Sequence, residues 1–462
     1  MQNQSEQGTL KSINPYNGEL LAEFSFFSPE QIYSKIEQAA KAQVTWKKLS
    51  VWQRTSHLIL LADLMDSKKT ELATLISSEM GKPIKEAIAE IEKCVNTTKY
   101  YASHGEAMLQ AMRIDLGNGT ASIQFEPLGL VFGIFPWNYP FWQVLRFAIP
   151  ALCAGNALVY KHAENVPQCA LAIEKLFKEI GLPEGLVSNI FCEISFIEAV
   201  IAHKSIKAVS LTGSENAGRS VAALAGKHLK KAVLELGGSD PFIVLADADI
   251  EKAAEAGVAS RFQNTGQSCV AAKRFIIHEA VFEDFTKAFA QKMYQLHSGN
   301  PLDASCDLGV LARPDLKSKL EAQVMQSVNQ GATILYGGTF SESTFFEPAI
   351  LYNIKKGMPA YHEELFGPVA AFFKIANTEE AIALANDTDF GLGASVWSNN
   401  PEVQQYFASA LDCGMVFINA LTKSSPELPF GGTKNSGIGR ELSEFGLREF
   451  VNIKTIVHHD HN

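Results

Sequence analysis

The sequence predicts an α/β protein in which parallel strands are covered by helices on both faces. From about residue 128 to residue 230, short apolar runs of strand length alternate with runs of helical periodicity, as expected of strands buried on both sides. A second alternating series runs from residue 236 to about residue 420, and no low-complexity linker separates the two. We therefore expect two packed units with a cleft between them.

The chain before the first series is predicted to be helical. Ser28 is placed as an N-cap, Pro29 takes the first helical position and Gln31 completes a capping box, so a helix should begin here. Further helical stretches extend over residues 51–109. The run "MRIDLGNGTASIQFEPLG" then alternates about an Asn-Gly turn at 118–119, which predicts a β-hairpin.

Within the first series, strand-like runs alternate with helix-like runs. The strand-like runs are "NALVYKH", "VSNIFCE" and "IKAVSLTG", and the helix-like runs are "PQCALAIEKLFKEIG", "SFIEAVIAHKS" and "NAGRSVAALAGKHL". Strands joined by helices in this way run parallel. The order predicts a nucleotide-binding type of unit in the first half of the chain.

The bulk composition is that of an ordinary globular protein. The 462 residues include 47% hydrophobic and 19% charged side chains, and the formal net charge is -10. The chain has no long lysine or arginine block, so neither a nucleic acid nor an anionic membrane is the expected partner. A small diffusible substrate is the better expectation.

The ends of the chain and its cysteines favour a cytoplasmic location. The polar start "MQNQSEQGTLKSINP" lacks the apolar core of a signal peptide, and no apolar run is long enough to span a bilayer. Seven cysteines show neither CxxC nor metal-ligand spacing. We therefore expect reduced thiols and no metal site, and we interpret the closing "HHDHN" as a frayed polar tail.

One cysteine stands apart from the others. Cys269 ends the small, polar run "NTGQSC", between a helix-like segment and the strand-like "KRFIIHE". Structural cysteines are usually buried among apolar neighbours, whereas a reactive thiol needs an activating group and a donor for the charge that its attack creates. Cys269 is therefore a candidate nucleophile, and we interpret the other six cysteines as core thiols.

Three residues could assist such a thiol, although each also has a plain structural explanation. Glu235 ends an apolar strand before a Gly-Gly pair that would let a ligand approach, and it is either a strand end meeting water or a base with raised proton affinity. Asn138 is either a turn residue or a fixed oxyanion donor. Arg146, in an apolar helical context, is either structurally paired or free for an anionic ligand.

The run "TGSENAG" could hold a phosphate. Gly213, Ser214 and Gly218 lie where a predicted strand turns into a predicted helix, so backbone N–H groups and the helix dipole could meet an anion. The spacing is not GxGxxG, and glycines at such turns often serve turn geometry alone. Both interpretations stay open on this run by itself.

Seven motifs, in this order, resemble those of the aldehyde dehydrogenase superfamily over nearly the whole chain. They are "PWNYP", "VYKHAE", "TGSENAG", "LELGGSDP", "NTGQSC", "EELFGPV" and "LPFGGTKNSGIGRE". Length and stretches such as "QNTGQSCVAAKRFII" look like the short bacterial succinate-semialdehyde dehydrogenases. The resemblance implies a Rossmann-type cofactor domain of residues 1–112 and 127–235, an α/β catalytic domain of residues 236–420, and a small β oligomerisation domain of residues 113–126 and 440–462.

The resemblance also implies roles for single residues. Cys269 would be the nucleophile, Glu235 the base that activates the deacylating water, and Asn138 half of an oxyanion hole completed by the Cys269 backbone N–H. The thiolate would add to an aldehyde, a hydride would pass to NAD, and water would release the acid from the resulting thioester. The implied cofactor-binding residues are Pro136, Trp137, Lys161, Glu164, Gly213, Ser214, Gly218, Leu236, Glu364 and Phe366.

The expected substrate is succinate semialdehyde, with another small aliphatic or aromatic aldehyde as the alternative. Arg146 matches an arginine that binds the substrate carboxylate in related enzymes. A second arginine of some relatives, six residues before the cysteine, is Gln263 here. That departure leaves Ser424, Ser425 or Arg261 to complete the carboxylate site.

The motif "KHAE" departs from the "KPSE" usual in the family, because His162 replaces a proline. Glu164 is retained, and a carboxylate beside the ribose would accept a hydrogen bond from a 2′-hydroxyl but repel a 2′-phosphate. NAD is therefore expected, with NADP possible. The family's hairpin and C-terminal strand further imply a homodimer or a homotetramer.

Two other classes of function account for part of the pattern. A cysteine hydrolase would also use a thiol, an oxyanion donor and a base, but among these motifs only "KHAE" holds a histidine, and the cofactor motifs would have no purpose. A non-catalytic binding or structural protein could share the fold, since fold does not determine function. The intact set of Cys269, Glu235 and Asn138 argues against the second class.

Overall fold

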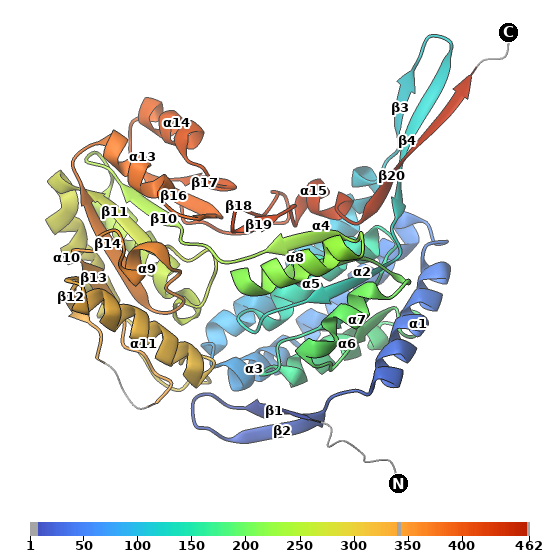
Figure 1. The fold of residues 1–462 in the computed structure, drawn as a ribbon, viewed down its shortest axis with the longest axis horizontal. Helices are drawn as coiled ribbons and strands as arrows, with labels where there is room; N and C mark the ends of the chain where they lie inside the picture. The colour runs from blue at the N-terminus through green and yellow to red at the C-terminus, as the bar shows by residue number, and fades with distance from the viewer. Residues whose placement is uncertain (1–7, 340–342, 460–462) are drawn as a thin grey trace.

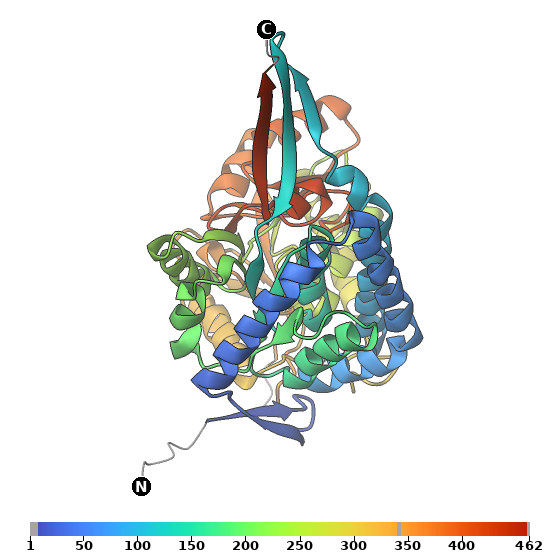
Figure 2. The same cartoon turned by 90° about the vertical axis from the view of Figure 1, so that its right-hand side faces the viewer.

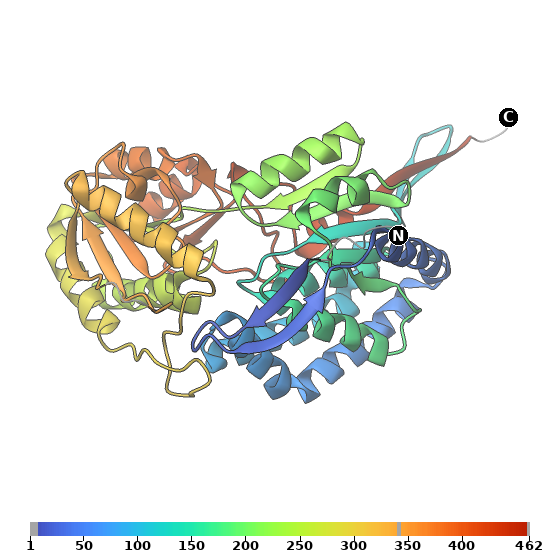
Figure 3. The same ribbon diagram turned by 60° about the horizontal axis from the view of Figure 1, so that its bottom comes forward.

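The computed structural model describes residues 8–339 and 343–459. Two α/β units, each built on its own sheet, lie side by side, and a narrow ribbon of strands projects from the first unit (Figures 1 and 3). This is the α/β architecture with parallel sheets that the sequence predicts, and it places a junction between two sheets near the middle of the molecule.

The first unit holds a six-stranded sheet whose strands run parallel except at one edge. Its order is β19 (Gly437–Ile438), β9 (Lys231–Glu235), β8 (Ile206–Thr212), β5 (Leu130–Ile134), β6 (Ala157–Lys161) and β7 (Val187–Asn189). The edge strand β19 is antiparallel to β9 and comes from near the end of the chain. The strand predicted in "VSNIFCE" exists but is limited to the three residues of β7.

Helices cover this sheet, and they confirm the helices predicted from residue 29 onward. They are α1 (Pro29–Trp46), α2 (Val51–Ser67), α3 (Lys69–Met80), α4 (Ile84–Met108), α5 (Pro140–Cys153), α6 (Pro167–Glu179), α7 (Ile197–Ala202) and α8 (Glu215–Lys227). Ser28 and Gln31 form the predicted capping box at the start of α1. Helix α5 is buried along its whole length, so its polar side chains face the interior of the protein.

The second unit holds a seven-stranded sheet. Its order is β12 (Thr333–Gly337), β13 (Ala349–Tyr352), β14 (Val369–Ile375), β11 (Arg274–His278), β10 (Pro241–Val244), β16 (Gly393–Trp397) and β17 (Met415–Ile418). All neighbours are parallel except β12 and β13. Its helices are α9 (Ile250–Phe262), α10 (Phe282–Met293), α11 (Pro314–Asn329), α12 (Pro359–His362), α13 (Thr378–Asn386) and α14 (Pro401–Ala410).

The projecting ribbon contains the predicted hairpin. Strands β3 (Met112–Asp115) and β4 (Gly119–Pro127) are antiparallel, and β20 (Val451–His459) pairs along the whole of β4 (Figure 2). The prediction of a frayed "HHDHN" tail is wrong for His458 and His459, because both pair with β4. Residues 460–462 lie outside the described residues.

Two features of the N- and C-terminal segments were not predicted. Strands β1 (Thr9–Ile13) and β2 (Leu20–Ser25) form a hairpin ahead of α1, where only helix was expected. Near the other end, β18 (Thr433–Lys434) pairs with β15 (Phe390–Gly391), and α15 (Ser443–Arg448) packs against α4 and α5 of the first unit. The segment after residue 420 therefore returns from the second unit to the first.

Among the described residues, no helix is both long enough and apolar enough to cross a membrane.

Each sheet has its own apolar core. One large cluster fills the first unit, and three smaller clusters fill the second. The junction between the units is therefore the place where polar side chains gather.

Candidate active site

Cys269 follows an unusual turn at the end of α9. Asn264, Thr265 and Gly266 have φ angles of 52°, 54° and 74°, in the left-handed region that side chains other than glycine rarely adopt. Such a conformation persists only where its surroundings enforce it. The turn ends α9 and directs the chain to Cys269 before β11 begins.

Buried hydrogen bonds enforce this turn. The Arg261 guanidinium donates to the carbonyl of Gly266 at 2.6 Å and to that of Ala272 at 3.0 Å. The Asn264 backbone N–H donates to the Glu86 carboxyl at 2.7 Å. Arg261 is fully buried and does not line the substrate-side cavity described below, so the alternative that it completes a carboxylate site is wrong: it braces the nucleophile's turn.

Cys269 is half-buried and lines two cavities at once. One cavity, of about 360 Å³, is bounded by β5, β8 and β9 loops of the first unit and by α11 and the 362–366 segment of the second. The other, of about 620 Å³, is bounded by α4, α5 and the 421–430 segment. We call them the cofactor-side and substrate-side cavities, and the thiol lies where a ligand in either one could reach it.

Most of the predicted cofactor residues line the cofactor-side cavity. They are Pro136, Trp137, Gly213, Ser214, Leu236, Glu364 and Phe366. Lys161 and Glu164 lie at the end of β6 outside its lining and pair with each other at 3.2 Å. Gly218 lies behind the lining: a Cβ there would be 2.4 Å from Leu236 Cδ1, so this glycine makes room for Leu236.

The cofactor-side cavity fits a nicotinamide dinucleotide. Helix α8 begins beside it with Ser214 as the N-cap, and a helix N-terminus offers free N–H groups to a phosphate. A Cβ at Gly213 would have no neighbour nearer than 3.6 Å, so the backbone can be approached closely there. Trp137 and Phe366, whose rings are 5.9 Å apart, give the cavity flat apolar walls.

Asn138 lies on the loop between β5 and α5 with its amide beside the nucleophile's turn. Its Nδ2 donates to the carbonyl of Gln267 at 3.1 Å, and Asn264 Nδ2 donates to the carbonyl of Asn138 at 2.8 Å. His162 steadies the same loop: its Nδ1 accepts from the Ala163 N–H, so Nε2 carries the proton and donates to the Pro140 carbonyl at 2.9 Å. The histidine that departs from the family's motif thus supports the loop that carries Asn138.

Glu235 ends β9 as a buried carboxyl, and neither of its oxygens has a hydrogen-bond partner among the described residues. Burial raises its pKa well above the usual range, and the nearby Glu441 raises it further, while Arg146 opposes the shift. A buried polar group without a partner calls for an explanation. Glu235 also raises the pKa of Cys269, so the two groups lie within electrostatic reach of each other.

Arg146 on α5 lines the substrate-side cavity, but its guanidinium is not free of protein partners. Its Nε forms an ion pair with Glu441, and its Nη2 lies 3.4 Å from Thr212 Oγ1. The Phe430 ring lies under the guanidinium, with its centroid 4.7 Å away. Both explanations offered for this arginine therefore hold in part: it is paired, and it also faces a cavity.

Ser424 and Ser425 line the same cavity. Ser425 is occupied as a donor to the Glu427 carboxyl, whereas Ser424 accepts from Lys93 Nζ at 2.5 Å. Gln263 lines the cavity as well. Lys93 was not predicted, because a lysine in an amphipathic helix is normally a solvated residue.

A buried lysine connects the nucleophile to the cofactor-side cavity. Lys273 Nζ donates to the carbonyls of Ser268 and Cys269 at 2.8 and 2.6 Å, and lies 3.1 Å from Glu364 Oε1. Glu364 in turn accepts from the Gly238 N–H at 3.2 Å. Lys273 was not predicted, since nothing in its spacing marks it.

The Gly-Gly pair after Glu235 admits protein groups. A Cβ at Gly237 would lie 2.5 Å from Glu364 Oε2, and one at Gly238 would lie 2.8 Å from the Cys269 carbonyl oxygen. We expected the missing side chains to make room for a ligand. At these two positions the room is taken mainly by other groups of the protein.

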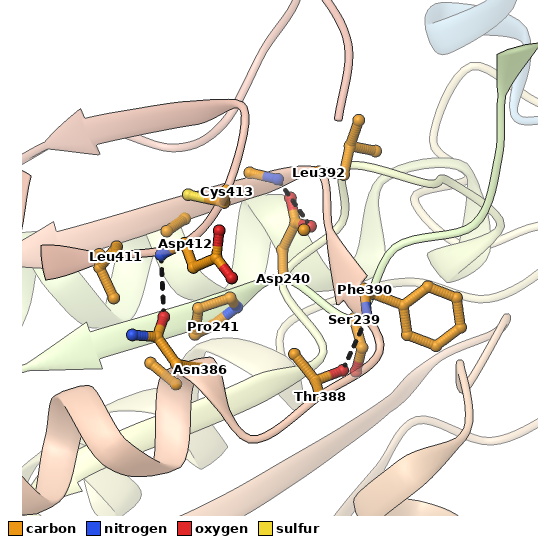
Figure 4. Close-up of a pocket in the computed structure, with 14 residues that line it drawn as sticks. Ser239, Asp240, Pro241, Asn386, Thr388, Phe390, Leu392, Leu411, Asp412 and Cys413 are labelled. Atoms are coloured by element: carbon orange, nitrogen blue, oxygen red, sulfur yellow. Dashed lines mark hydrogen bonds between the residues drawn. The ribbon is translucent and has the colours of Figure 1, made fainter. Parts of the chain in front are cut away.

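A third, much smaller cavity of about 10 Å³ adjoins Asp240, Asn386 and Cys413 (Figure 4). Such a volume admits about one water molecule, so this is not a substrate site. Asp240 accepts from the Gly393 N–H at 3.1 Å, and burial raises its pKa to about 7. Cys413 is half-buried, and the other five cysteines interpreted as core thiols are buried.

Two α/β units thus meet at a half-buried thiol between a cavity that fits a dinucleotide and a second cavity, as in a dinucleotide-dependent oxidoreductase. The chain belongs to the aldehyde dehydrogenase family, whose model matches residues 2–456, which confirms the resemblance seen in the motifs. The protein is thus an NAD(P)-dependent oxidoreductase that converts an aldehyde to a carboxylic acid.

Three relatives illustrate the likeness. The succinate-semialdehyde dehydrogenase [NADP(+)] of Deinococcus radiodurans is 44% identical, over 96% of this chain and 94% of the relative. The succinate semialdehyde dehydrogenase [NAD(P)+] of Escherichia coli K12 is 43% identical, over 96% and 97%. The crystal structure of succinic semialdehyde dehydrogenase from Streptococcus pyogenes with NADP+ is 34% identical, with a TM-score of 0.95 over 98% of this chain and 100% of that one.

The pH dependence of thiol reactivity tests the electrostatics of this site. Burial raises the pKa of Cys269 to about 11, and Lys273 and Arg146 only partly offset it. Because the thiolate is the reactive form, alkylation of Cys269 by iodoacetamide in the cofactor-free protein should accelerate about tenfold per pH unit from pH 7 to pH 10. Peptide mass spectrometry measures the rate, with Cys269→Ser as the blank.

Cys413 serves as an internal comparison, because its pKa is raised to about 12 by burial and it is also half-buried. Cys269 should react faster than Cys413 at every pH. A Cys269 rate that is already constant near pH 7 would show an ionised thiol and contradict the expectation.

Proposed function

We propose that this aldehyde dehydrogenase oxidises succinate semialdehyde to succinate at Cys269. The observation that carries the proposal is the position of Cys269 between a cavity that fits a dinucleotide and a cavity whose lining includes Arg146, Ser424 and Ser425. The names of the relatives above support the same substrate. The alternative is another small aliphatic or aromatic aldehyde.

Covalent attack by Cys269 would begin the reaction. The thiolate adds to the aldehyde carbon, and the oxyanion that forms is held by Asn138 Nδ2 and by the Cys269 backbone N–H. Each such donor contributes about 3–4 kcal/mol in comparable sites. Asn138 suits this role because its amide already lies beside the turn, 3.1 Å from the Gln267 carbonyl.

Glu235 would serve as the base for the deacylating water. Its carboxyl is buried, without a hydrogen-bond partner among the described residues, and its pKa is raised by burial and by Glu441. Because its pKa is raised, Glu235 must first lose its proton, and the carboxylate that results is a strong base that can take a proton from the water. The water then attacks the thioester at Cys269 and releases the acid.

The cofactor would be held from both units. A bound nicotinamide dinucleotide supplies the hydride acceptor. Glu364 and Phe366 would hold the nicotinamide ribose and ring, Ser214 a phosphate, and Lys161 with Glu164 the adenine ribose. Lys273 holds Glu364 in position through the ion pair between them.

The carboxylate of the substrate would bind at the far side of the substrate-side cavity. Arg146 retains guanidinium N–H groups beyond the Nε paired with Glu441, and Ser424 and Ser425 lie on the segment opposite α5 in the same cavity lining. We assign the carboxylate to these three side chains.

Both NAD and NADP should be accepted. Glu164 disfavours a 2′-phosphate, but Lys161 lies 3.2 Å from its carboxylate and could meet the phosphate instead. Relatives are named for NADP(+) and for NAD(P)+. We therefore expect NAD to be preferred over NADP, but not to exclude it.

We expect the projecting ribbons to pair between subunits in a homodimer, or in a homotetramer built from dimers. We also expect a cytoplasmic enzyme. The division into a cofactor domain (1–112 and 127–235), a catalytic domain (236–420) and an oligomerisation domain (113–126 and 440–462) is part of the proposal. Its support is the ribbon itself, where Ile453 and Val457 of β20 are 62% and 45% exposed. Exposed apolar strands of this kind usually pair with another chain.

A panel of aldehydes tests the proposed substrate. With either cofactor, kcat/KM should be at least about tenfold higher for succinate semialdehyde than for butanal or benzaldehyde, because only the first has a carboxylate to bind. Cys269→Ala should abolish turnover. Equal kcat/KM values across the panel would favour the alternative aldehyde, and ester hydrolysis without aldehyde oxidation would indicate a hydrolase.

The cofactor preference depends on Glu164. Glu164→Gln should raise the NADP-to-NAD ratio of kcat/KM about tenfold, the effect of removing about 1.4 kcal/mol of repulsion. Glu184→Gln, an exposed change distant from the motif in the sequence, is the matched control. An unchanged ratio in the Glu164 variant would show that this carboxylate does not face the 2′ position.

The oligomer depends on the ribbon. The double change Ile453→Glu and Val457→Glu should convert the assembly to monomers, since like charges would face each other across the paired strands. Analytical ultracentrifugation measures the mass. Tyr294→Glu, at a residue of the second unit that is 61% exposed, should leave the mass unchanged, and a doubly substituted protein that stays assembled would place the interface elsewhere.

A further inference from the structure

Lys93 extends from the middle of α4 into the substrate-side cavity. Its Nζ donates to Ser424 Oγ at 2.5 Å and lies 4.3 Å from the centroid of the Trp142 ring. Among the residues that the structure describes, Lys93 forms no ion pair. A hydroxyl and an aromatic face solvate an ammonium group but do not neutralise it.

The carboxyl groups around this cavity are already engaged. Glu441 pairs with Arg146, Glu90 pairs with Lys82, Glu92 pairs with Lys69, Glu427 accepts from Ser425, and Glu86 accepts from the backbone of the turn before Cys269. Lys93 is therefore a half-buried cation that none of these carboxyls neutralises, whereas Lys423, the other lysine of the lining, is exposed. Partly buried cations are normally paired, so the missing anion has to come from outside the protein.

A second observation points the same way. Burial, and after it the positive charge of Arg146, lower the pKa of Lys93 to about 8. Arg146 and Lys93 each disfavour the charge of the other, and an anion placed between them would stabilise both. Arg146 and Lys93 line one cavity together with Cys269, which is where the far end of a short aldehyde would lie.

We propose that Lys93, together with Ser424, supplies the second cationic contact to the substrate's carboxylate, in the role left open by Gln263. This inference rests on the proposed function and adds a specificity-determining residue to it. The ammonium group gives a charge-assisted hydrogen bond to the carboxylate, and Ser424 holds the ammonium in position. Arg146, tied to Glu441, then forms the opposite side of the site.

Substitution of Lys93 tests the inference. In Lys93→Met, the ratio of kcat/KM for succinate semialdehyde to that for butanal should fall about tenfold or more, mainly through KM for the carboxylated substrate. Lys93→Arg should retain most of the ratio. Lys99→Met removes an exposed charge from the same helix outside the cavity and should leave the ratio unchanged.

The pH dependence separates charge from shape. Since kcat/KM reports the free enzyme, the wild-type ratio should be high below pH 8 and decline as Lys93 loses its proton above it, whereas in Lys93→Arg it should stay level. The other titratable groups of this cavity are common to both proteins, and the ratio of two aldehydes cancels the ionisation of the thiol. They are Glu86, Glu90, Glu92, Tyr100, Tyr139, Arg146, Cys269, Lys423 and Glu427.

The two proposals fail in different ways. If the wild-type enzyme does not distinguish succinate semialdehyde from butanal, the proposed substrate is wrong. If it does distinguish them and Lys93→Met keeps the same ratio while remaining folded by circular dichroism, the assignment of Lys93 is wrong.

Discussion

The site depends on a backbone constraint: three consecutive left-handed residues that end α9 and present Cys269 between the two units. Asn264 and Thr265 would each relax to ordinary backbone angles in a free peptide, at a gain of about 1 kcal/mol or more. Arg261, Gln267 and Glu86 prevent this by taking the polar groups of the turn into buried hydrogen bonds. The fold thus holds a strained turn so that a thiol is exposed to two cavities.

The surroundings of Cys269 disfavour the ionised form of the thiol that this turn presents. Burial and the carboxylates of Glu364 and Glu235 all disfavour a thiolate at Cys269, and Lys273 and Arg146 only partly compensate. The same burial keeps Glu235 a strong proton acceptor. Because burial disfavours both groups as anions, both are mainly protonated in the cofactor-free protein, and a ligand that brings positive charge would lower their pKa values and favour the reactive forms.

Local features of the sequence predicted much of this arrangement. Capping at Ser28, the alternation of strands and helices, and the polar setting of Cys269 are properties of adjacent residues, and they appear in the structure as expected. The motif resemblance located most of the cofactor-side lining. What it could not locate were contacts between distant segments, such as Glu441 with Arg146 and Lys93 with Ser424. The local hairpin of β1 and β2 was not predicted because its short strands carry no clear periodicity.

The convergence of Glu235, Cys269 and Glu364 has one physical cause. After Glu235 the chain leaves the first sheet and enters the second at β10, and the connection between the two strands contains Gly237 and Gly238. A side chain at either would collide with Glu364 or with the backbone of Cys269. Base, nucleophile and a cofactor-side carboxylate can therefore converge only because the crossing strand has no bulk at this point. The chemistry is placed at the junction of two sheets because that is where one chain can bring three of its segments within contact distance.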